Sequence, residues 1–584
     1  MQKNLVFKPR LFESLKTYNK ETFMKDLMAG IIVGIVALPL AIAFGIASGV
    51  SPEKGIITAI VAGFIISLLG GTKVQIGGPT GAFIVIIYGI VNNPEYGVQG
   101  LLIATILAGV MLVALGVCKM GAVIKFIPYP IIIGFTAGIA LTIFTTQMGD
   151  VLGLTQEATT QAGEIVRVPL KTPGDFVGKW IAYAQNINTF NLWNFIVAIG
   201  SLLVIIFSPK ALAKVPVLNK IPGSLYGILI GTGAVLLIKQ LMPEVQIDTI
   251  GDRFHIQAQL PAMVVPEFTM ETVTNLMPIA FTIAILGAIE SLLSAAVADG
   301  VISDRHDSNT ELIAQGVANI VSPLFGGIPA TGAIARTAAN GKNGGRTPVA
   351  GMVHSVVVLI ILCVLMPKAS LIPMPTIAAI LFVVAYNMCG WRNIRNTIKT
   401  APKSDIAVLF VTLIFTVIFD LVVAIGVGLV LAALLFMKRM ADVTEGREWV
   451  DIDDEESDPD NILLKKIPDN TRVYEINGPM FFAATDKFRY VLDDKNIDVL
   501  CIRMRNVPAI DASGVEMLMN VVKRCERHNI KVVFSHVNEQ PMKAMEKAGF
   551  VKHVGKENFC DHIDTALIRA AEIEKKVSAE KNKK

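Results

Sequence analysis

The sequence predicts an α-helical polytopic membrane protein that ends in a small soluble domain of the α/β class. Its 584 residues are 53% hydrophobic and 17% charged, and the mean hydropathy is +0.58. Soluble domains carry about 25% charged residues, so this composition indicates a membrane protein. Half of all charged residues lie in 441–584, although this segment is much the shorter part of the chain. The sequence therefore joins a membrane part to a water-soluble part near residue 440.

Apolar runs long enough to cross a bilayer recur between residues 27 and 437, and they divide into about fourteen segments. They define an expected transmembrane domain at 25–440. Basic residues concentrate in the connections after even-numbered segments, such as the one at 392–403, which predicts a cell-membrane protein with both termini in the cytoplasm. The other expected parts are a cytoplasmic N-terminal segment at 1–24, an acidic linker at 441–465, a soluble domain at 466–575 and a basic tail at 576–584.

Two of the apolar runs are broken by similar glycine–proline clusters, at 77–82 and 326–333. Both clusters contain Thr-Gly-Ala, and the two copies lie 251 residues apart. This offset indicates a duplicated unit of seven segments, and because seven is odd the second copy is inverted in the membrane. Inverted repeats with interrupted helices are typical of transporters, whose binding site lies where the broken helices meet.

A helix that begins inside the membrane exposes free N–H groups and the positive end of its dipole, which together favour an anion. The two breaks therefore predict an anion site. The alternative is that each cluster is a kink that only serves packing. The candidate binding residues at the two helix starts are Thr80, Gly81, Ala82, Thr331, Gly332 and Ala333.

Glu290 and Arg336 are ionisable residues within the repeats, where a charge at a helix centre costs about 2.5–3.5 kcal/mol. Arg336 follows the second break by about one turn and would attract an anion. Glu290 would repel an anion unless it is protonated, which predicts coupling to a proton. Ser294 lies one turn further along the same helix face and could add a hydroxyl. The alternative is a structural ion pair between Glu290 and Arg336.

A run of specific motifs surrounds these candidate residues. They are Glu290–Ser294, Arg305-His306, Glu311-Leu312, Ala314–Gly316, Phe325–Pro329 and Ala335–Thr337, with Ala29-Gly30, Leu38-Pro39 and Ala43-Phe44 earlier in the chain. The sequence resembles the SulP family of anion transporters over nearly its whole length. The resemblance implies two inverted seven-helix repeats arranged as a core and a gate, a homodimer and an elevator-like cycle. It also implies an anion site that includes Phe44, Thr80, Glu290, Ala335 and Arg336.

Members of this family move sulfate, bicarbonate, chloride or dicarboxylates, by proton or sodium symport or by exchange. The sodium-coupled bicarbonate members carry an aspartate at the position of Glu290 and threonines nearby, whereas this chain has Ser294 and Ile334. Because Ile334 has no oxygen for a hard cation, the sequence favours secondary active transport of sulfate by proton symport or by anion exchange. The alternatives are a bicarbonate or dicarboxylate carrier, a nucleobase permease, and a non-transporting scaffold that senses anions through the soluble domain.

Strand-like and helix-like runs alternate in the soluble domain, with strands expected at 473–476, 499–504 and 530–535. The segment 507–514 resembles the signature of STAS domains, which follow SulP membrane domains. The resemblance implies that Ser513 matches a serine that is phosphorylated in some regulatory STAS proteins. The alternative is that Asp511 or Ser513 caps the next helix.

The sequence lacks a phosphate-binding GxxxxGKS loop, a metal-ligand cluster and a nucleophile motif, so we expect no enzyme activity, cofactor or metal. The net charge of +4 gives no support for a nucleic-acid partner. The expected partners are an inorganic anion, with sulfate favoured, a proton as the coupling ion, the lipid bilayer and a second copy of the chain.

Overall fold

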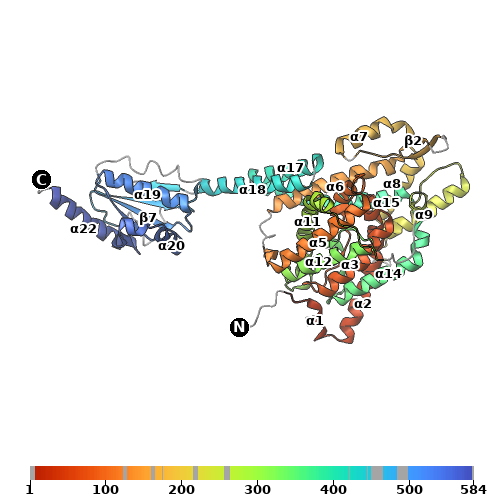
Figure 1. Ribbon diagram of the computed structural model, residues 1–584, viewed down its shortest axis with the longest axis horizontal. Coiled ribbons are helices and arrows are strands. Elements are labelled where there is room, and N and C mark those ends of the chain that lie inside the picture. The colour runs from red at the N-terminus through yellow and green to blue at the C-terminus, as the bar shows by residue number, and fades with distance from the viewer. Residues whose placement is uncertain are drawn as a thin grey trace. The chain divides into compact units, whose positions relative to one another are not determined.

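The computed structural model describes residues 7–122, 128–159, 165–173, 175–212, 214, 221–254, 263–419, 421–443, 445–448, 465–482 and 497–581. These residues form two compact units, Met1–Leu429 and Val430–Lys584 (Figure 1). The division between the units falls within helix α18 (Leu421–Val443). Most of the expected acidic linker, including the run at 451–460, lies outside the described residues.

The first unit is almost entirely helical. Within the described ranges, nine helices are long and apolar enough to cross a membrane, and two shorter apolar helices lie at Gly81–Val91 and Val349–Val364. A membrane-spanning helical domain was predicted and is confirmed. Its helices are α1 (Arg10–Leu15), α2 (Lys20–Ala47), α3 (Pro52–Leu69), α4 (Ile84–Val91), α5 (Gly97–Val117), α6 (Tyr129–Leu152), α7 (Phe176–Gln185), α8 (Leu192–Ala211), α9 (Gly223–Leu241), α10 (Ile250–Arg253), α11 (Met270–Ile302), α12 (Ser308–Leu324), α13 (Ile334–Lys342), α14 (Val349–Ala369), α15 (Met374–Cys389), α16 (Trp391–Thr400), α17 (Lys403–Ile418) and the start of α18.

Polar side chains define where several of these helices begin. Asn19 accepts a hydrogen bond from the Thr22 N–H at 2.8 Å and starts α2, and Asp307 accepts one from the Thr310 N–H at 2.9 Å and starts α12. Such caps satisfy N–H groups that have no partner inside the helix. These two capping residues therefore stabilise the first turns of α2 and α12.

The helices pack in two groups, each of which draws on both halves of the chain. In the core group, α14 packs on α2 and α3, and α12 packs on α3 and α5. In the gate group, α15 and α17 pack on α6, and α8 packs on α9 and α15. Two inverted repeats that each contribute to a core and to a gate predict this mixing of the halves.

The two ends of this unit differ in structure. At the hairpin end, strands β2 (Thr155–Thr159) and β3 (Ile165–Pro169) form an antiparallel pair directly after α6, and α15 begins nearby because Met374 N–H donates to Asp248 O at 2.9 Å. At the opposite end, here called the α16 end, α6 begins and α15 runs into α16. Ile133 of α6 and Ile394 of α16 pack together there.

The second unit is built on a five-stranded sheet in the order β5-β6-β7-β8-β9. The strand β5 is antiparallel to β6, and the other neighbours are parallel. The strands expected at 473–476, 499–504 and 530–535 are confirmed as β6, β7 and β8. The elements are β5 (Glu445–Glu448), β6 (Thr471–Asn477), β7 (Val499–Asn506), α19 (Ala512–Arg527), β8 (Lys531–Ser535), α20 (Glu539–Lys547), α21 (Phe550–Val554), β9 (Phe559–Cys560) and α22 (Ile563–Lys581).

Alternate residues of β7 face two different layers of this unit. Leu500 belongs to the cluster that contains Leu518 of α19, whereas Cys501 belongs to the cluster that contains Ala566 of α22. Val577 packs against the second cluster. This contact stabilises the end of α22, which continues to Lys581 within the tail expected at 576–584.

Asp511 caps α19, as the alternative interpretation of this segment holds. One carboxylate oxygen of Asp511 accepts the Gly514 N–H at 2.8 Å, and the other accepts the Phe482 N–H at 3.1 Å. Ser513 lies half-buried in the first turn, and its hydroxyl makes no hydrogen bond to the part of the chain described here. Phosphorylation of Ser513 stays a prediction.

We expect Asp511→Ala to lower the unfolding free energy of the soluble segment 441–584 by about 1 kcal/mol, because the hydrogen bonds that the Asp511 carboxylate accepts from backbone N–H groups are lost. Urea unfolding of the segment measures this difference. Ser513→Ala is the matched control and should unfold at the wild-type urea concentration. An equal or larger loss in the serine variant would contradict the assignment of the cap to Asp511.

Candidate functional site

Two broken helices cross each other inside the core group. The strand β1 (Gly77–Gly78) pairs antiparallel with β4 (Thr331–Gly332), with Gly77 opposite Gly332 and Gly78 opposite Thr331. A short 3₁₀ turn, η1 (Gly81–Phe83), and α4 follow the first break, and α13 follows the second. Both breaks that the sequence predicts are therefore present, and they pair with each other.

Ser291 of α11 holds the second break from behind. Its hydroxyl lies 2.6 Å from the Thr331 hydroxyl and accepts the Gly332 N–H at 3.2 Å. The Thr331 hydroxyl also donates to the Gly287 carbonyl oxygen at 3.1 Å. Because Thr331 and Gly332 are fully bonded to the scaffold and do not line the cavity described below, their side of the break acts as a support.

Thr337 of α13 joins the two breaks through one hydroxyl. It accepts the Ile76 N–H at 3.0 Å and the Ser294 hydroxyl at 3.0 Å. Ser294, predicted as a binding residue, is fully buried and faces this scaffold rather than the cavity. Asn319 adds a further support, because its amide accepts the Ala330 N–H and donates to the Ala330 carbonyl, both at 2.8 Å.

A cavity of about 670 Å³ lies in front of the crossing, between the core group and the gate group. It extends to the α16 end, where Tyr129, Gly223 and Gly390 line it. The predicted site residues that line this cavity are Phe44, Thr80, Gly81, Ala82, Glu290, Ala333, Ala335 and Arg336. Most of the predicted site is therefore brought together at one surface.

Arg336 places a guanidinium at the first break. Its Nη2 donates to the Pro79 carbonyl oxygen, while Nη1 has no hydrogen-bond partner among the described residues. The buried hydroxyl of Thr80 is likewise without a partner there. Gly78 has a φ of +149° and lies so close to the guanidinium that a Cβ would approach Nη1 to 2.7 Å. Glycine at this position thus lets the positive charge reach the helix break.

Glu290 is the second charged residue of the cavity lining. Its side chain is 8% exposed, and it makes no ion pair or hydrogen bond with any residue in the ranges that the structure describes. A structural ion pair between Glu290 and Arg336 is therefore not formed. The lining of the cavity thus includes the carboxyl group of Glu290 and the guanidinium of Arg336, which are not bonded to each other.

The gate group supplies lining residues that the sequence reasoning did not single out. Asn387 and Met388 of α15, Asn393 of α16 and Thr136 of α6 all line the cavity. Met388 lies close to the first break, since a Cβ on Gly81 would approach its sulfur to 2.7 Å. Asn387 and Asn393 are the signal for these lining residues in the sequence. This signal is weak because polar residues are common at helix ends.

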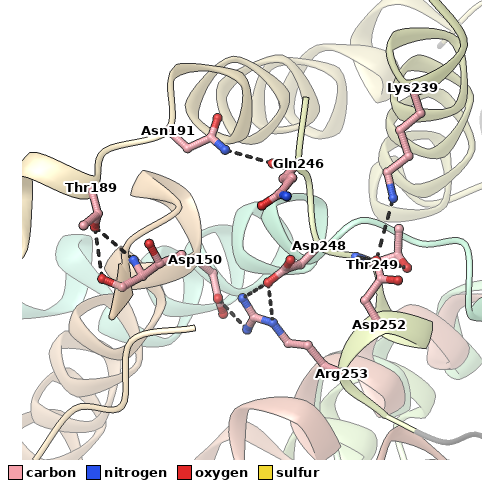
Figure 2. Close-up of polar contacts among 10 residues, drawn as sticks. Asp150, Thr189, Asn191, Lys239, Gln246, Asp248, Thr249, Asp252 and Arg253 are labelled. Atoms are coloured by element: carbon pink, nitrogen blue, oxygen red, sulfur yellow. Dashed lines mark hydrogen bonds and ion pairs between the residues drawn. The ribbon is translucent and has the colours of Figure 1, made fainter. Parts of the chain in front are cut away.

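The hairpin end of the gate group is held by a polar cluster (Figure 2). Arg253 of α10 lies between two carboxylates, with Nη1 2.7 Å from Asp150 Oδ1 at the end of α6 and Nη2 3.0 Å from Asp248 Oδ2. Asn191, at the start of α8, donates to the Gln246 carbonyl at 2.8 Å. The loop that contains Gln246 and Asp248 therefore ties α6, α8 and α10 together.

Asp252 extends this cluster to α9. Burial acts to raise the pKa of Asp252, but hydrogen bonds from the Thr249 N–H and hydroxyl, both at 2.8 Å, and the charge of Lys239 on α9 outweigh burial and lower it. A separate contact joins gate and core at this end, where the Lys179 ammonium of α7 lies 5.5 Å from the Tyr88 ring of α4. The hairpin end thus has a contact between core and gate beside a smaller hollow of about 170 Å³ lined by Ile46, Tyr88 and Asp150, whereas the cavity reaches the α16 end.

A membrane domain with two crossed half-helices and a charged cavity in front of them defines the class of secondary transporters. The sulfate permease family matches residues 23–412, and a STAS domain matches residues 462–566. The chain belongs to the sulfate permease family. It is an anion transporter and not an enzyme.

Similar proteins span nearly the whole chain. "Putative sulfate transporter YvdB" of Bacillus subtilis is 41% identical over 553 residues, covering 94% of this chain and 98% of its own. "Bicarbonate transporter BicA" of Picosynechococcus is 27% identical over 549 residues, covering 91% of each chain. The solved structure of SLC26A9 superposes with a TM-score of 0.83 at 18% identity, covering 96% of this chain and 92% of that one. The fold is therefore that of SLC26-like transporters with a C-terminal STAS domain.

We expect Gly77→Ala to destabilise the crossing by about 1–3 kcal/mol, because a new Cβ would overlap a stiff β-branched neighbour in a packed interior. A Cβ on Gly77 would lie 2.3 Å from Cδ1 and 3.0 Å from Cβ of Ile66. Thermal unfolding of the purified protein in detergent measures the change. Gly300→Ala on α11 is the control, since no atom lies within 4 Å of its new Cβ. Equal melting temperatures for the two variants would contradict the argument.

Proposed function

We propose that the protein is a secondary active transporter that moves sulfate across the cell membrane by proton symport or by anion exchange. The observation that carries the proposal is a pair of donors at the first break, Arg336 Nη1 and the Thr80 hydroxyl, which have no partner among the described residues and lie on the wall of the cavity. A guanidinium and helix N-termini are the groups that bind oxyanions in proteins. The binding surface would comprise Phe44, Thr80, Gly81, Ala82, Ala333, Ala335 and Arg336.

Glu290 would couple anion movement to a proton. An ionised carboxylate in the same cavity repels an anion, whereas a protonated one does not. Burying an unpaired charge also costs free energy. If a proton enters together with the anion, it neutralises Glu290, which removes both the repulsion of the anion and the cost of the buried charge. The 8% exposure of Glu290 and the absence of an Arg336 pair within the described ranges support this role.

Sulfate is favoured among the anions by the comparison with relatives. The one with 41% identity is named "Putative sulfate transporter YvdB", whereas BicA, named as a bicarbonate transporter, is 27% identical. A proton is favoured over sodium as the coupling ion because Ile334 lines the cavity and offers no oxygen to a sodium ion. Bicarbonate or dicarboxylate transport is the second candidate, since the same donors bind any carboxylate or carbonate.

The remaining expectations belong to the same proposal. The α16 end would face the cytoplasm together with both termini, because this end carries the basic connections, and the cavity would then be inward-open. Movement of the core group against the gate group in a homodimer would carry the anion across. A non-transporting scaffold is disfavoured, because a scaffold has no need of Glu290 and Arg336 in a cavity.

Arg336→Ala should weaken sulfate binding about tenfold or more, since a charged hydrogen bond contributes roughly 1.5–3 kcal/mol. Binding of labelled sulfate to the purified protein measures the loss. Arg336→Lys keeps the charge but not the contact to Pro79, so its affinity for sulfate should lie between those of the wild type and Arg336→Ala. Lys342→Ala, an exposed cation two turns along the same helix, is the control. Unchanged affinity in Arg336→Ala would remove Arg336 from the site.

Glu290→Gln should retain sulfate binding but lose accumulation driven by a proton gradient, because glutamine does not exchange a proton. Uptake into proteoliposomes is measured with an inward proton gradient, an inward sodium gradient or neither. Glu271→Gln, an exposed carboxyl group at the start of the same helix, is the control. Proton-driven accumulation by the Glu290 variant would contradict the coupling role. Wild-type uptake driven by sodium alone would contradict proton coupling.

A further inference from the structure

A second hollow lies on the gate group, next to the anion cavity along α15. Its volume is about 720 Å³, within the range of small-molecule pockets. It is formed by α6, α8 and α15, and its lining includes Ala137, Leu141, Phe144, Ile206, Phe382 and Tyr386. Leu141 and Tyr386 are 40% and 73% exposed. An open apolar groove on membrane-spanning helices is suited to an acyl chain.

The groove reaches the α16 end of the unit. Ala137 and Cys389 line it, and both pack with Ile394, which lies on α16. One end of the groove therefore adjoins the first turn of α16. Asn387 adds an amide group to the lining near this end.

The helix α16 has the character of an interfacial helix. Ile394 and Thr397 are buried, whereas Trp391 and Ile398 are 62% and 42% exposed. Tryptophan beside exposed apolar residues is typical of the boundary between the acyl chains and the headgroups. The helix therefore places the end of the groove at the level of lipid headgroups.

The exposed face of α16 is cationic. Arg392, Arg395 and Lys399 are spaced three and four residues apart, so they share one side of the helix, and all three are exposed. The helix contains no acidic residue, and no ion pair joins these cations to any residue in the described ranges. Juxtamembrane clusters of this kind attract anionic headgroups with about 1 kcal/mol for each cation.

We propose that the groove between α6, α8 and α15 binds an anionic phospholipid, with an acyl chain along the groove and the phosphate beside Arg392, Arg395 and Lys399. The apolar lining accounts for the chain, and the cations on the exposed face of α16 account for the headgroup charge. A sterol would leave the cations unused, and a free phosphate would leave the groove unfilled. The groove shares Val383, Asn387 and Cys389 with the anion cavity, so a bound lipid would contact the same helix wall as the transported anion.

Native mass spectrometry of the purified, delipidated full chain tests the proposal. The protein is titrated with palmitoyl-oleoyl phosphatidylglycerol or with the phosphatidylcholine of the same chains. We expect the wild type to bind phosphatidylglycerol more tightly, with a gain of about fivefold for each cation that contributes. The variant with Arg392→Gln, Arg395→Gln and Lys399→Gln should bind both lipids alike.

A groove variant tests the chain separately from the charge. Leu141→Trp should reduce the binding of both lipids, because the indole fills the groove. The controls are Leu229→Trp, an exposed position on α9 outside the groove, and Lys16→Gln with Lys20→Gln, two exposed cations of the N-terminal segment. Matching melting temperatures establish that each variant is folded.

Four outcomes would overturn the proposal. Equal binding of the two lipids by the wild type would remove the headgroup site. Wild-type binding by Leu141→Trp would remove the acyl-chain site. Displacement of phosphatidylglycerol by millimolar inorganic phosphate would make the site one for free phosphate. A loss of dimers in Leu141→Trp without loss of lipid would make the groove an interface between two copies.

Discussion

The antiparallel crossing of the two broken helices is the constraint on which the rest of the membrane unit depends. Gly77 and Gly78 pair with Gly332 and Thr331 in the interior of the core group. A helix broken at membrane depth loses internal hydrogen bonds that neither lipid nor bulk water replaces. The two breaks therefore have to meet, because each supplies the backbone partners that the other lacks. This requirement brings the two halves of the chain together in opposite orientations.

Polar side chains around the crossing divide into two sets. One set, made up of Ser291, Thr337 and Asn319, forms hydrogen bonds with the backbone of the breaks and lies behind the cavity surface. Arg336 and Glu290 line the cavity and do not pair with each other, and Arg336 Nη1 has no partner in the ranges that the structure describes. A rigid, satisfied scaffold behind a partly unsatisfied surface is what an anion site requires, because donors held in place lose little entropy when a ligand binds.

Much of this arrangement could be predicted because its signals are local or periodic. Apolar runs, the Thr-Gly-Ala copies 251 residues apart and charges within apolar segments are all readable from the sequence. They led to the helical membrane fold, to the two breaks and to Thr80, Glu290 and Arg336 at one cavity. The soluble domain was equally readable, because its buried strands and amphipathic helices have short periods.

The sequence by itself determined which segments enter the membrane, where two of them break and which side chains bring charge to the breaks. Only the tertiary structure decided what each side chain faces. Ser294 shares a helix face with Glu290 but meets Thr337, and Asp150 meets Arg253 across a hundred residues of chain. The reason is physical: helical periodicity defines the face on which a residue lies, whereas its partner depends on the helix packed opposite, which is chosen by the fold as a whole.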